Sequence, residues 1–330
     1  WANSAHSVIV VTLLPIFFDS VAGYTADSVS SMSTWGYATS IAMAIVALAA
    51  PFLGVFGDIR GMRKRLFALF MGVGVVAVAL LSFTPLMDFT SSTAAAGRVA
   101  GLILVLYIVS VIGFDASAIY YDAFLTDITT EDRMDRVSTM GYGLGYIGGS
   151  TIPLVIFLVM NLVGIPMLTC LAVIFAVTAV WWLGFSLPLL KNCRQTSGKP
   201  YEKGDVGRSI RGVGATIREI IANKPMLVYI LAYFFYIDGV HTVISMATTY
   251  GTNLGLDSTG MLLALLLVQV LGLPFCLLHI RLSARFGART MVGVGVCVYM
   301  FICVFAFFMR SLWQFWLLAV LCATSQGGIQ

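Results

Sequence analysis

Long apolar runs separated by short polar segments make up nearly the whole chain. A helix needs about 20 predominantly apolar residues to cross the hydrocarbon of a bilayer. Ten runs meet or approach that length, and we expect each to be a membrane span. They cover residues 4–22, 34–57, 66–86, 98–121, 137–160, 163–187, 225–249, 259–280, 290–309 and 312–330. Because lipid offers no partner to an unpaired backbone group, all ten are predicted to be α-helices.

The distribution of basic residues supports this count of spans. Successive connections between spans must lie on opposite sides of the membrane. Only Arg98 and Arg310 fall on one side, and the other 17 of the 19 Lys and Arg residues fall on the opposite side. Basic residues accumulate on the cytoplasmic side of membrane proteins. The connections that contain residues 60–65, 133–136, 191–224 and 281–289 are therefore predicted to be cytoplasmic.

Composition agrees with a chain that lies mostly in lipid. The sequence is 59% hydrophobic and 10% charged, with a mean hydropathy of +0.96, whereas soluble domains carry about 25% charged residues. The net charge of +4 reflects the basic cytoplasmic connections. No basic stripe is interleaved with aromatic residues, so nucleic acid is not an expected partner.

One long polar segment divides the predicted spans into six and four. We predict an N-terminal bundle over residues 1–188, a cytoplasmic linker over 189–224 and a C-terminal bundle over 225–330. Apolar residues recur at helical spacing within the linker, at Val206, Ile210, Val213, Ile217 and Ile221. This pattern predicts an amphipathic helix on the cytoplasmic membrane surface, although a solvated tether fits it equally well.

The turn between the second and third runs concentrates charge. "GVFGDIRGMRKR", residues 54–65, resembles the major facilitator signature G-x-x-x-D-R-x-G-R-R, with the first arginine one place late. The matching residues are Gly54, Asp58, Arg60, Gly61, Arg63 and Lys64. We expect Gly54 to permit close helix approach and Gly61 a tight turn. The resemblance implies that Asp58 and the cations form a cytoplasmic gate. The alternative is a turn whose basic residues serve only to orient the protein in the membrane.

A weaker copy of this motif follows the eighth run. In "RLSARFGARTM", Gly287 and Arg289 align with Gly61 and Arg63, while Ala284 replaces the acid. Repeated bundles of this kind are typical of secondary transporters. The chain is therefore expected to be an all-α polytopic membrane protein with the major facilitator fold, which has two six-helix bundles in the full protein.

A narrower resemblance covers essentially the whole chain. The segment "YYDAFLTDITTEDRMDRVSTMGYGLGYIGG", residues 120–149, is similar to the vacuole-effluxer family of major facilitators. "WANSAHS", "LAYFFYIDGVHTVISMA" and "GGIQ" carry the same likeness, in the family's order. The resemblance implies a fold of about twelve spans, so we expect about two further spans after Gln330.

A charged side chain within a membrane helix is costly, which makes it a functional candidate. Asp238 lies near the midpoint of the seventh run, and His241, Thr242 and Ser245 follow on the same helix face. An acid and a histidine one turn apart can pass a proton or bind a cationic group. A structural pair that links two helices is the alternative.

The fourth run holds a second intramembrane acid, Asp115, with Tyr107 two turns before it and Asp122 two turns after it. We expect Asp115 to line a central cavity. Asp122 is expected at the cytoplasmic boundary, where "DAFLTD" and the acids 131, 132 and 135 form an acidic surface. That surface is predicted to pair with the basic turns, including residues 60–65.

Other polar residues in the spans are weaker candidates for the substrate or proton pathway. Asn3, His6 and Ser7 form a polar patch that we place near the cytoplasmic end of the first span. Tyr236 could stack on a ligand, and Gln269 is a single polar group in the eighth span. Helix packing explains Asn3, His6 and Ser7 equally well, and it is the more common role of residues such as Gln269 and Tyr236. Gly141, Gly145 and Gly149 predict a flat packing face on the fifth span, which we interpret as a moving seam between the bundles.

These features predict a secondary active transporter that moves a small solute by alternating access. The family resemblance favours efflux of an amino-acid-like metabolite, with protons as the expected coupling ion, by a monomer surrounded by membrane lipids. It implies the cytoplasmic membrane of a bacterium or the vacuolar membrane of a fungus. The three histidines lie in no hydrolase or metal-binding motif, so we expect no enzyme, metal or cofactor. A transport-inactive receptor or scaffold on the same fold is the alternative function.

Overall fold

The structure, a computed structural model, describes the backbone of residues 1–25, 31–198 and 205–329. Nine long helices are α1 (Ala2–Ala22), α2 (Ser31–Gly57), α3 (Met62–Leu81), α4 (Thr93–Ala123), α8 (Met167–Asn192), α10 (Lys224–Asn253), α11 (Ser258–Phe286), α12 (Ala288–Phe307) and α13 (Leu312–Ile329). The fifth span consists of α6 (Met134–Gly145), the π-helix η3 (Tyr146–Thr151) and α7 (Ile152–Leu162). The linker helix is α9 (Asp205–Ala222), and the short elements are η1 (Thr84–Leu86), α5 (Leu125–Ile128) and η2 (Glu131–Arg133).

The predicted fold class is confirmed. Within the described residues, nine helical stretches are long and apolar enough to cross a membrane, and they coincide with the first nine predicted runs. The tenth run forms α13, whose apolar part, Leu312–Gln326, is shorter than a full span. The described residues form helices and turns, and no strand occurs among them.

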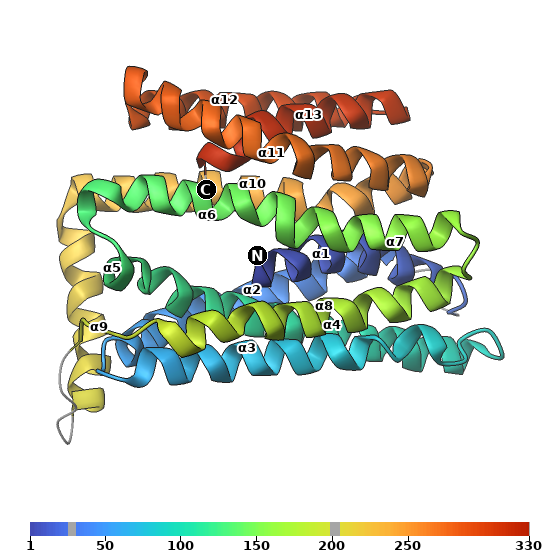
Figure 1. The fold of residues 1–330 in the computed structure, drawn as a ribbon, viewed down its shortest axis with the longest axis horizontal. Coiled ribbons are helices and arrows are strands. Elements are labelled where there is room, and N and C mark those ends of the chain that lie inside the picture. The colour runs from blue at the N-terminus through green and yellow to red at the C-terminus, as the bar shows by residue number, and fades with distance from the viewer. Residues whose placement is uncertain (26–30, 199–204, 330) are drawn as a thin grey trace.

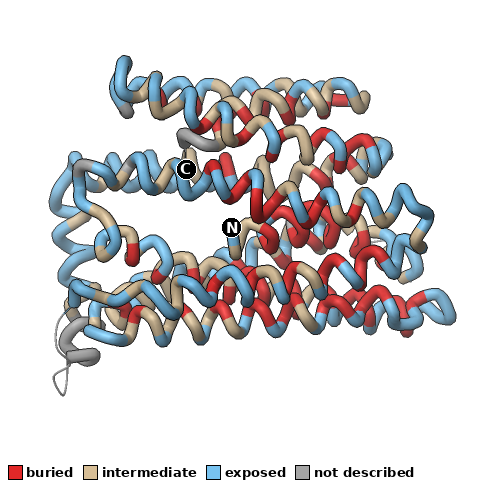
Figure 2. Tube along the Cα trace, in the orientation of Figure 1, coloured by how far each residue is buried: buried red, intermediate tan, exposed pale blue. Residues whose placement is uncertain are grey.

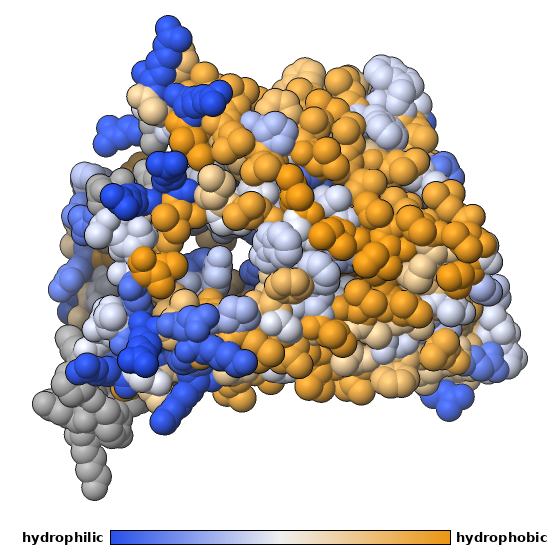
Figure 3. Space-filling model, viewed as in Figure 1, coloured by the Kyte–Doolittle hydropathy of each residue, from blue (hydrophilic) through white to orange (hydrophobic). Residues whose placement is uncertain are grey.

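The spans lie side by side, and their connections gather at two opposite ends (Figure 1). α9 crosses the end that carries the basic connections, roughly perpendicular to the spans. Hydrophilic side chains collect at this end, and apolar side chains cover the middle of the molecule (Figure 3). This arrangement agrees with the predicted cytoplasmic side.

The apolar interior falls into two clusters. The first is formed by residues of spans one to six, among them Phe17, Trp35 and Phe175, and it extends to Leu262 of α11. The second lies among α10 to α13 and includes Val240 and Phe315. Each set of helices therefore has its own packed core, and the two cores approach each other near one end.

The two sets of helices meet mainly toward the external end. α1 packs against α10, and α11 packs against α6 and η3. Buried residues concentrate in the external half of the molecule, whereas the cytoplasmic halves of the spans are more exposed (Figure 2). The structure is thus closed externally and more open toward the cytoplasm.

Glycines set two features of this packing. A Cβ at Gly113 of α4 would lie 2.6 Å from the backbone nitrogen of Gly74 of α3, so only glycine permits this helix crossing. Gly61 and Gly287 have φ angles of 81° and 85°, and each lies in the turn before the next helix, α3 or α12. The tight turn predicted at Gly61 is confirmed, and its counterpart at Gly287 supports the internal repeat.

Candidate functional site

One face of α10 turns toward the N-terminal set of helices. At the external end of this face, Thr249 and Thr252 lie in a pocket with residues of α1 and α2. Asp238, Thr242 and Ser245 lie on the same helical stripe, because they precede Thr249 by eleven, seven and four residues. The opposite stripe, which includes Val240, packs into the core of α10 to α13. The predicted polar face of the seventh span therefore points between the two sets of helices.

The cytoplasmic half of this interface is hollow. A passage between the two sets of helices is visible in the space-filling view (Figure 3). Asp238, His241 and Thr242 are exposed, although they lie in the middle of a membrane span. Asp238 and His241 are close enough to interact electrostatically, as their spacing of one helical turn predicts.

Asp115 of α4 lies mostly within the protein. Its Oδ2 atom is buried and has no hydrogen-bond partner among the described atoms. Tyr107, two turns away, interacts electrostatically with Asp115, and its hydroxyl lies 2.9 Å from the Thr39 hydroxyl of α2. The Tyr107 ring also stacks on Trp35, with 4.2 Å between ring centroids. Tyr107, which interacts with this carboxylate, is thus held in place by Thr39 and Trp35 of α2.

Three spans bring tyrosines and an acid together on the cytoplasmic side of Asp115. Asp122 of α4 and Tyr233 of α10 both lie close enough to Tyr142 of α6 for an electrostatic interaction. Asp122 is exposed, and Tyr142 and Tyr233 are 41% and 46% exposed. Because Tyr233 belongs to the C-terminal set of helices, this group includes side chains of both sets.

The polar patch of the first span lies beside the fifth span. Gly145 and Gly149 of the fifth span face Ser4 and Trp1 of α1. Asn3, His6 and Ser7, on the same turns of α1, therefore lie level with the middle of the fifth span. The position of this patch near the cytoplasmic end of the first span stays a prediction.

His6 is sealed inside the N-terminal set of helices. Its ring stacks on Phe114 at 4.7 Å, lies 4.9 Å from the Trp182 ring, and is 3% exposed. Its Nε2 atom is 3.3 Å from the Ser110 hydroxyl. Asn3 is half-buried on the neighbouring turn. These surroundings favour a packing role for His6.

The remaining pathway candidates lie in different surroundings. Tyr236 packs against the core of α10 to α13, with its ring 5.3 Å from that of Tyr233. Gln269 is buried on the face of α11 whose later residues, Gly272 and Cys276, touch the fifth span. Gln269 therefore belongs to the interface between the two sets of helices, whereas Tyr236 faces the C-terminal core.

The turn of residues 54–65 and the segments that bond to it form a cytoplasmic cluster, and a buried ion pair lies at its centre. Nη1 of Arg63 donates to Oδ2 of Asp127 at 2.5 Å, and the two side chains are only 6% and 0% exposed. The same Nη1 lies 3.0 Å from the carbonyl of Ala123 and 3.2 Å from the hydroxyl of Ser197. The predicted pairing of the acidic surface with the basic turn is thus confirmed for Arg63 and Asp127.

The start of the linker is bound to the same turn. Oδ1 of Asp127 accepts hydrogen bonds from the backbone N–H and the hydroxyl of both Thr196 and Ser197, at 2.8 to 3.1 Å. Gln195 accepts from the N–H of Gly61 at 2.8 Å and donates to the Gly57 carbonyl at 3.1 Å. Lys64 donates to the carbonyl of Cys193 at 3.1 Å. Residues 193–197 are therefore held against the turn of residues 54–65 by hydrogen bonds.

The other motif residues take less part in these bonds. Asp58 and Arg60 are exposed. A Cβ at Gly54 would meet nothing within 4 Å, whereas one at Gly57 would lie 3.1 Å from the Tyr120 ring. The close helix approach predicted for Gly54 thus occurs one turn later, at Gly57. Among the described residues, the bonds of this cluster reach α4, α5 and the linker, and none reaches α10 to α13.

Sequence reasoning missed Gln195, Thr196 and Ser197. Three consecutive short polar side chains directly after the last basic residues of the sixth span are a usable signal, because such residues bond backbone groups readily. Nothing in their spacing indicates the partner, however, since Gly61 lies 134 residues away from Gln195.

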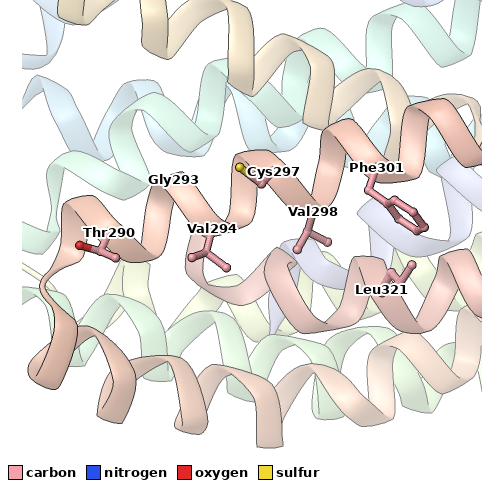
Figure 4. Close-up of a pocket in the computed structure, with 7 residues that line it drawn as sticks. All are labelled: Thr290, Gly293, Val294, Cys297, Val298, Phe301 and Leu321. Atoms are coloured by element: carbon pink, nitrogen blue, oxygen red, sulfur yellow. The ribbon is translucent and has the colours of Figure 1, made fainter.

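A broad groove along α12 is a separate feature. It is lined by small and apolar residues of α12, such as Val294 and Phe301, and by Leu321 of α13 (Figure 4). It contains no charged side chain and lies away from α1 and α4, so it does not belong to the polar interface described above.

The two sets of membrane helices and the polar interface between them give this chain the major facilitator fold. The structure resembles the xylose transporter XylE from E. coli, in a partially occluded inward-open conformation, with a TM-score of 0.58 and 14% identity. The likeness covers 99% of this chain and 83% of that chain, and it shows the fold.

The sequence defines the family more narrowly. The chain belongs to the family described as vacuole effluxer Atg22 like, whose model matches residues 19–330. YxiO of Bacillus subtilis (strain 168), described as an uncharacterized MFS-type transporter, is 40% identical over all of this chain and 76% of its own length. Autophagy-related protein 22-1 of Penicillium rubens is 24% identical over 50% of this chain and 30% of its own. The protein is a multi-pass membrane transporter and not an enzyme.

Proposed function

We propose that the protein moves a small solute across the membrane by alternating access between its two sets of helices. The observation that carries this proposal is the polar stripe of α10. Asp238 and Thr242 are exposed in the middle of the span, and Thr249 on the same stripe lies in the pocket at the closed external end. Residues 1–188 and 225–330 would be the two moving units, joined by the linker, and the monomer in lipid would be complete for transport.

Asp115, Asp238 and His241 are the proposed pathway for a proton or for a charged group of the solute. Intramembrane acids that border an aqueous hollow can exchange protons with it, and His241, one helical turn from Asp238, interacts with it electrostatically. Gln269 and Asn3 are proposed as polar groups near the same interface. The export direction is proposed from the family description, vacuole effluxer, and the amino-acid-like solute from the sequence resemblance given above.

The cytoplasmic cluster is proposed to act as the gate on that side. Arg63, Lys64 and Asp127 bond to residues of the segment 193–197, and the linker leads from there through α9 to α10. Movement of the C-terminal helices would therefore pull on the same anchor. Asp58 and Arg60, which are exposed in this conformation, are available for contacts with the C-terminal helices when the cytoplasmic side closes.

Flux measurements in proteoliposomes test this function. A panel of amino acids and other small metabolites is assayed with and without a pH gradient. We expect flux of at least one solute, and loss of gradient-driven flux in Asp115→Asn, Asp238→Asn and His241→Ala. Asp88→Asn is the control, because its carboxylate lies in an exposed external loop and bonds only to Thr90 and Ser91 among the described residues. Flux of no solute under any gradient would indicate a receptor or scaffold.

A further inference from the structure

A small polar pocket at the external end joins the two sets of helices. It is lined by Pro15, Phe18 and Asp19 of α1, Ser31 and Trp35 of α2, and Thr249 and Thr252 of α10. The free space at its centre admits about one particle the size of a water molecule. The proposed transport pathway makes no use of this pocket.

The oxygens of the pocket are mostly hydrogen-bond acceptors. The Ser31 hydroxyl donates its hydrogen to Oδ1 of Asp19. The Thr252 hydroxyl donates to the carbonyl of Thr248 at 3.0 Å. A hydroxyl has one hydrogen to donate, so the remaining lone pairs of both oxygens can only accept. The ionised carboxylate of Asp19 likewise only accepts.

The hydroxyl of Thr249 is an independent indication that the pocket binds a ligand. Its side chain is 7% exposed, and its hydroxyl oxygen is buried without a hydrogen-bond partner among the described atoms. Buried polar groups in proteins nearly always have a partner, so this hydroxyl at the wall of a polar pocket points to a ligand.

No basic side chain balances Asp19 within the described part of the chain. Arg98 bonds to the carbonyl of Ala94 and Arg310 to that of Met309, and the one ion pair among the described residues is Arg63–Asp127. The pocket therefore combines one negative charge, several acceptor oxygens and room for one small particle.

We propose that this pocket binds a single Na⁺ ion. One carboxylate balances one positive charge, and carboxylate and hydroxyl oxygens are the ligands that hard cations prefer. A water molecule would donate only two hydrogens and would leave acceptors unused, whereas a cation is attracted to all of them.

The ligands come from α1 and α2 on one side and from α10 on the other. A bound ion therefore links the two sets of helices only while the external end is closed. The ion would bind the externally closed conformation more tightly than the externally open one, and it would therefore favour the closed conformation. Na⁺ in the external medium would then shift the conformational equilibrium of the transporter.

Thermal unfolding of the purified full chain in detergent tests the site without any assumption about transport. The midpoint is measured in NaCl and in choline chloride at equal ionic strength. We expect Na⁺ to raise the midpoint in a saturable manner. Thr249→Val, which keeps the shape and removes the hydroxyl, should weaken the apparent Na⁺ affinity by about tenfold. Asp19→Asn should abolish the shift, and Thr249→Ser should retain it.

Thr248→Val is the matched control. The Thr248 hydroxyl is also buried without a partner among the described atoms, but it does not line the pocket. This variant should keep the full Na⁺ shift. The absence of a Na⁺-specific shift in the unmodified chain, or a shift that survives Thr249→Val unchanged, would mean that the pocket holds water only. Either result overturns the site and leaves the proposed transport function standing, because flux is measured separately.

Discussion

At the scale of single residues, Arg63 holds the cytoplasmic cluster together. Its guanidinium is the only cation that reaches Asp127 in the described structure, and both side chains are almost completely buried. Removal of one partner from a buried ion pair leaves an uncompensated charge, which costs about 3–5 kcal/mol.

Arg63→Ala is therefore expected to lower the free energy of unfolding by about 3–5 kcal/mol, as measured by SDS titration in mixed micelles. Arg60→Ala is the control, because Arg60 lies in the same turn and is exposed; it should change the free energy by no more than about 0.5 kcal/mol. Equal effects of the two substitutions would show that the ion pair does not anchor the linker.

In contrast to the substitution of Arg63, substitution of Asp115 is expected to increase the stability of the protein. The reason is that the buried Oδ2 atom of Asp115 has no hydrogen-bond partner among the described atoms. Asp115→Asn removes a buried charge, so it should raise the free energy of unfolding by about 1 kcal/mol while gradient-driven flux is lost. Tyr107→Phe removes the hydroxyl that bonds to Thr39 and should lower the free energy by about 1 kcal/mol. Loss of stability in Asp115→Asn would assign this carboxylate a structural role.

At the scale of elements, the fifth span lies between the two sets of helices. Gly145 and Gly149 face α1, whereas a Cβ at Gly143 would lie 2.8 Å from Leu273 of α11. The span changes to a π-helix at Tyr146, whose ring packs on Gly272 of α11. Such π-helical turns are frequent at functional positions, which agrees with the proposed role of this span as a moving seam.

Two of the three glycines of the predicted flat face should respond differently to substitution. A Cβ at Gly149 would lie 2.2 Å from the Trp1 carbonyl oxygen, so Gly149→Ala should destabilise the protein by about 1–3 kcal/mol. A Cβ at Gly141 would meet only the Tyr121 hydroxyl, at 4.0 Å, so Gly141→Ala should be neutral or stabilise α6 by about 0.5–1 kcal/mol. Unfolding midpoints of the two variants check this, and equal midpoints would contradict the described packing of α1 on η3.

The elements themselves were predictable because lipid acts on each apolar run separately. Run length located nine spans, and the basic residues oriented them. Contacts between distant segments were not predictable in the same way. The binding of Gln195 to Gly61 and the crossing of Gly74 with Gly113 depend on which helices become neighbours.

At the scale of the whole molecule, buried residues concentrate near the external end (Figure 2). A hollow lies between the two sets of helices in their cytoplasmic half (Figure 3). The packed bundles are rigid compared with the few contacts between them, so relative rotation of the bundles is the motion that the architecture favours. In the opposite conformation, α10 would leave α1 and α2 and open the pocket at Asp19 to the outside.

Distances between spin labels at the two ends of the bundles test alternating access most directly. After replacement of the six native cysteines, one pair is placed at the exposed cytoplasmic positions Lys191 and Arg285, and another at the exposed external positions Thr93 and Thr259. Pulsed electron paramagnetic resonance in nanodiscs should give two populations, in which the external distance lengthens as the cytoplasmic distance shortens. A single fixed distance at both ends, unchanged by transported solute or by pH, would contradict a mechanism in which the bundles rock about the hollow.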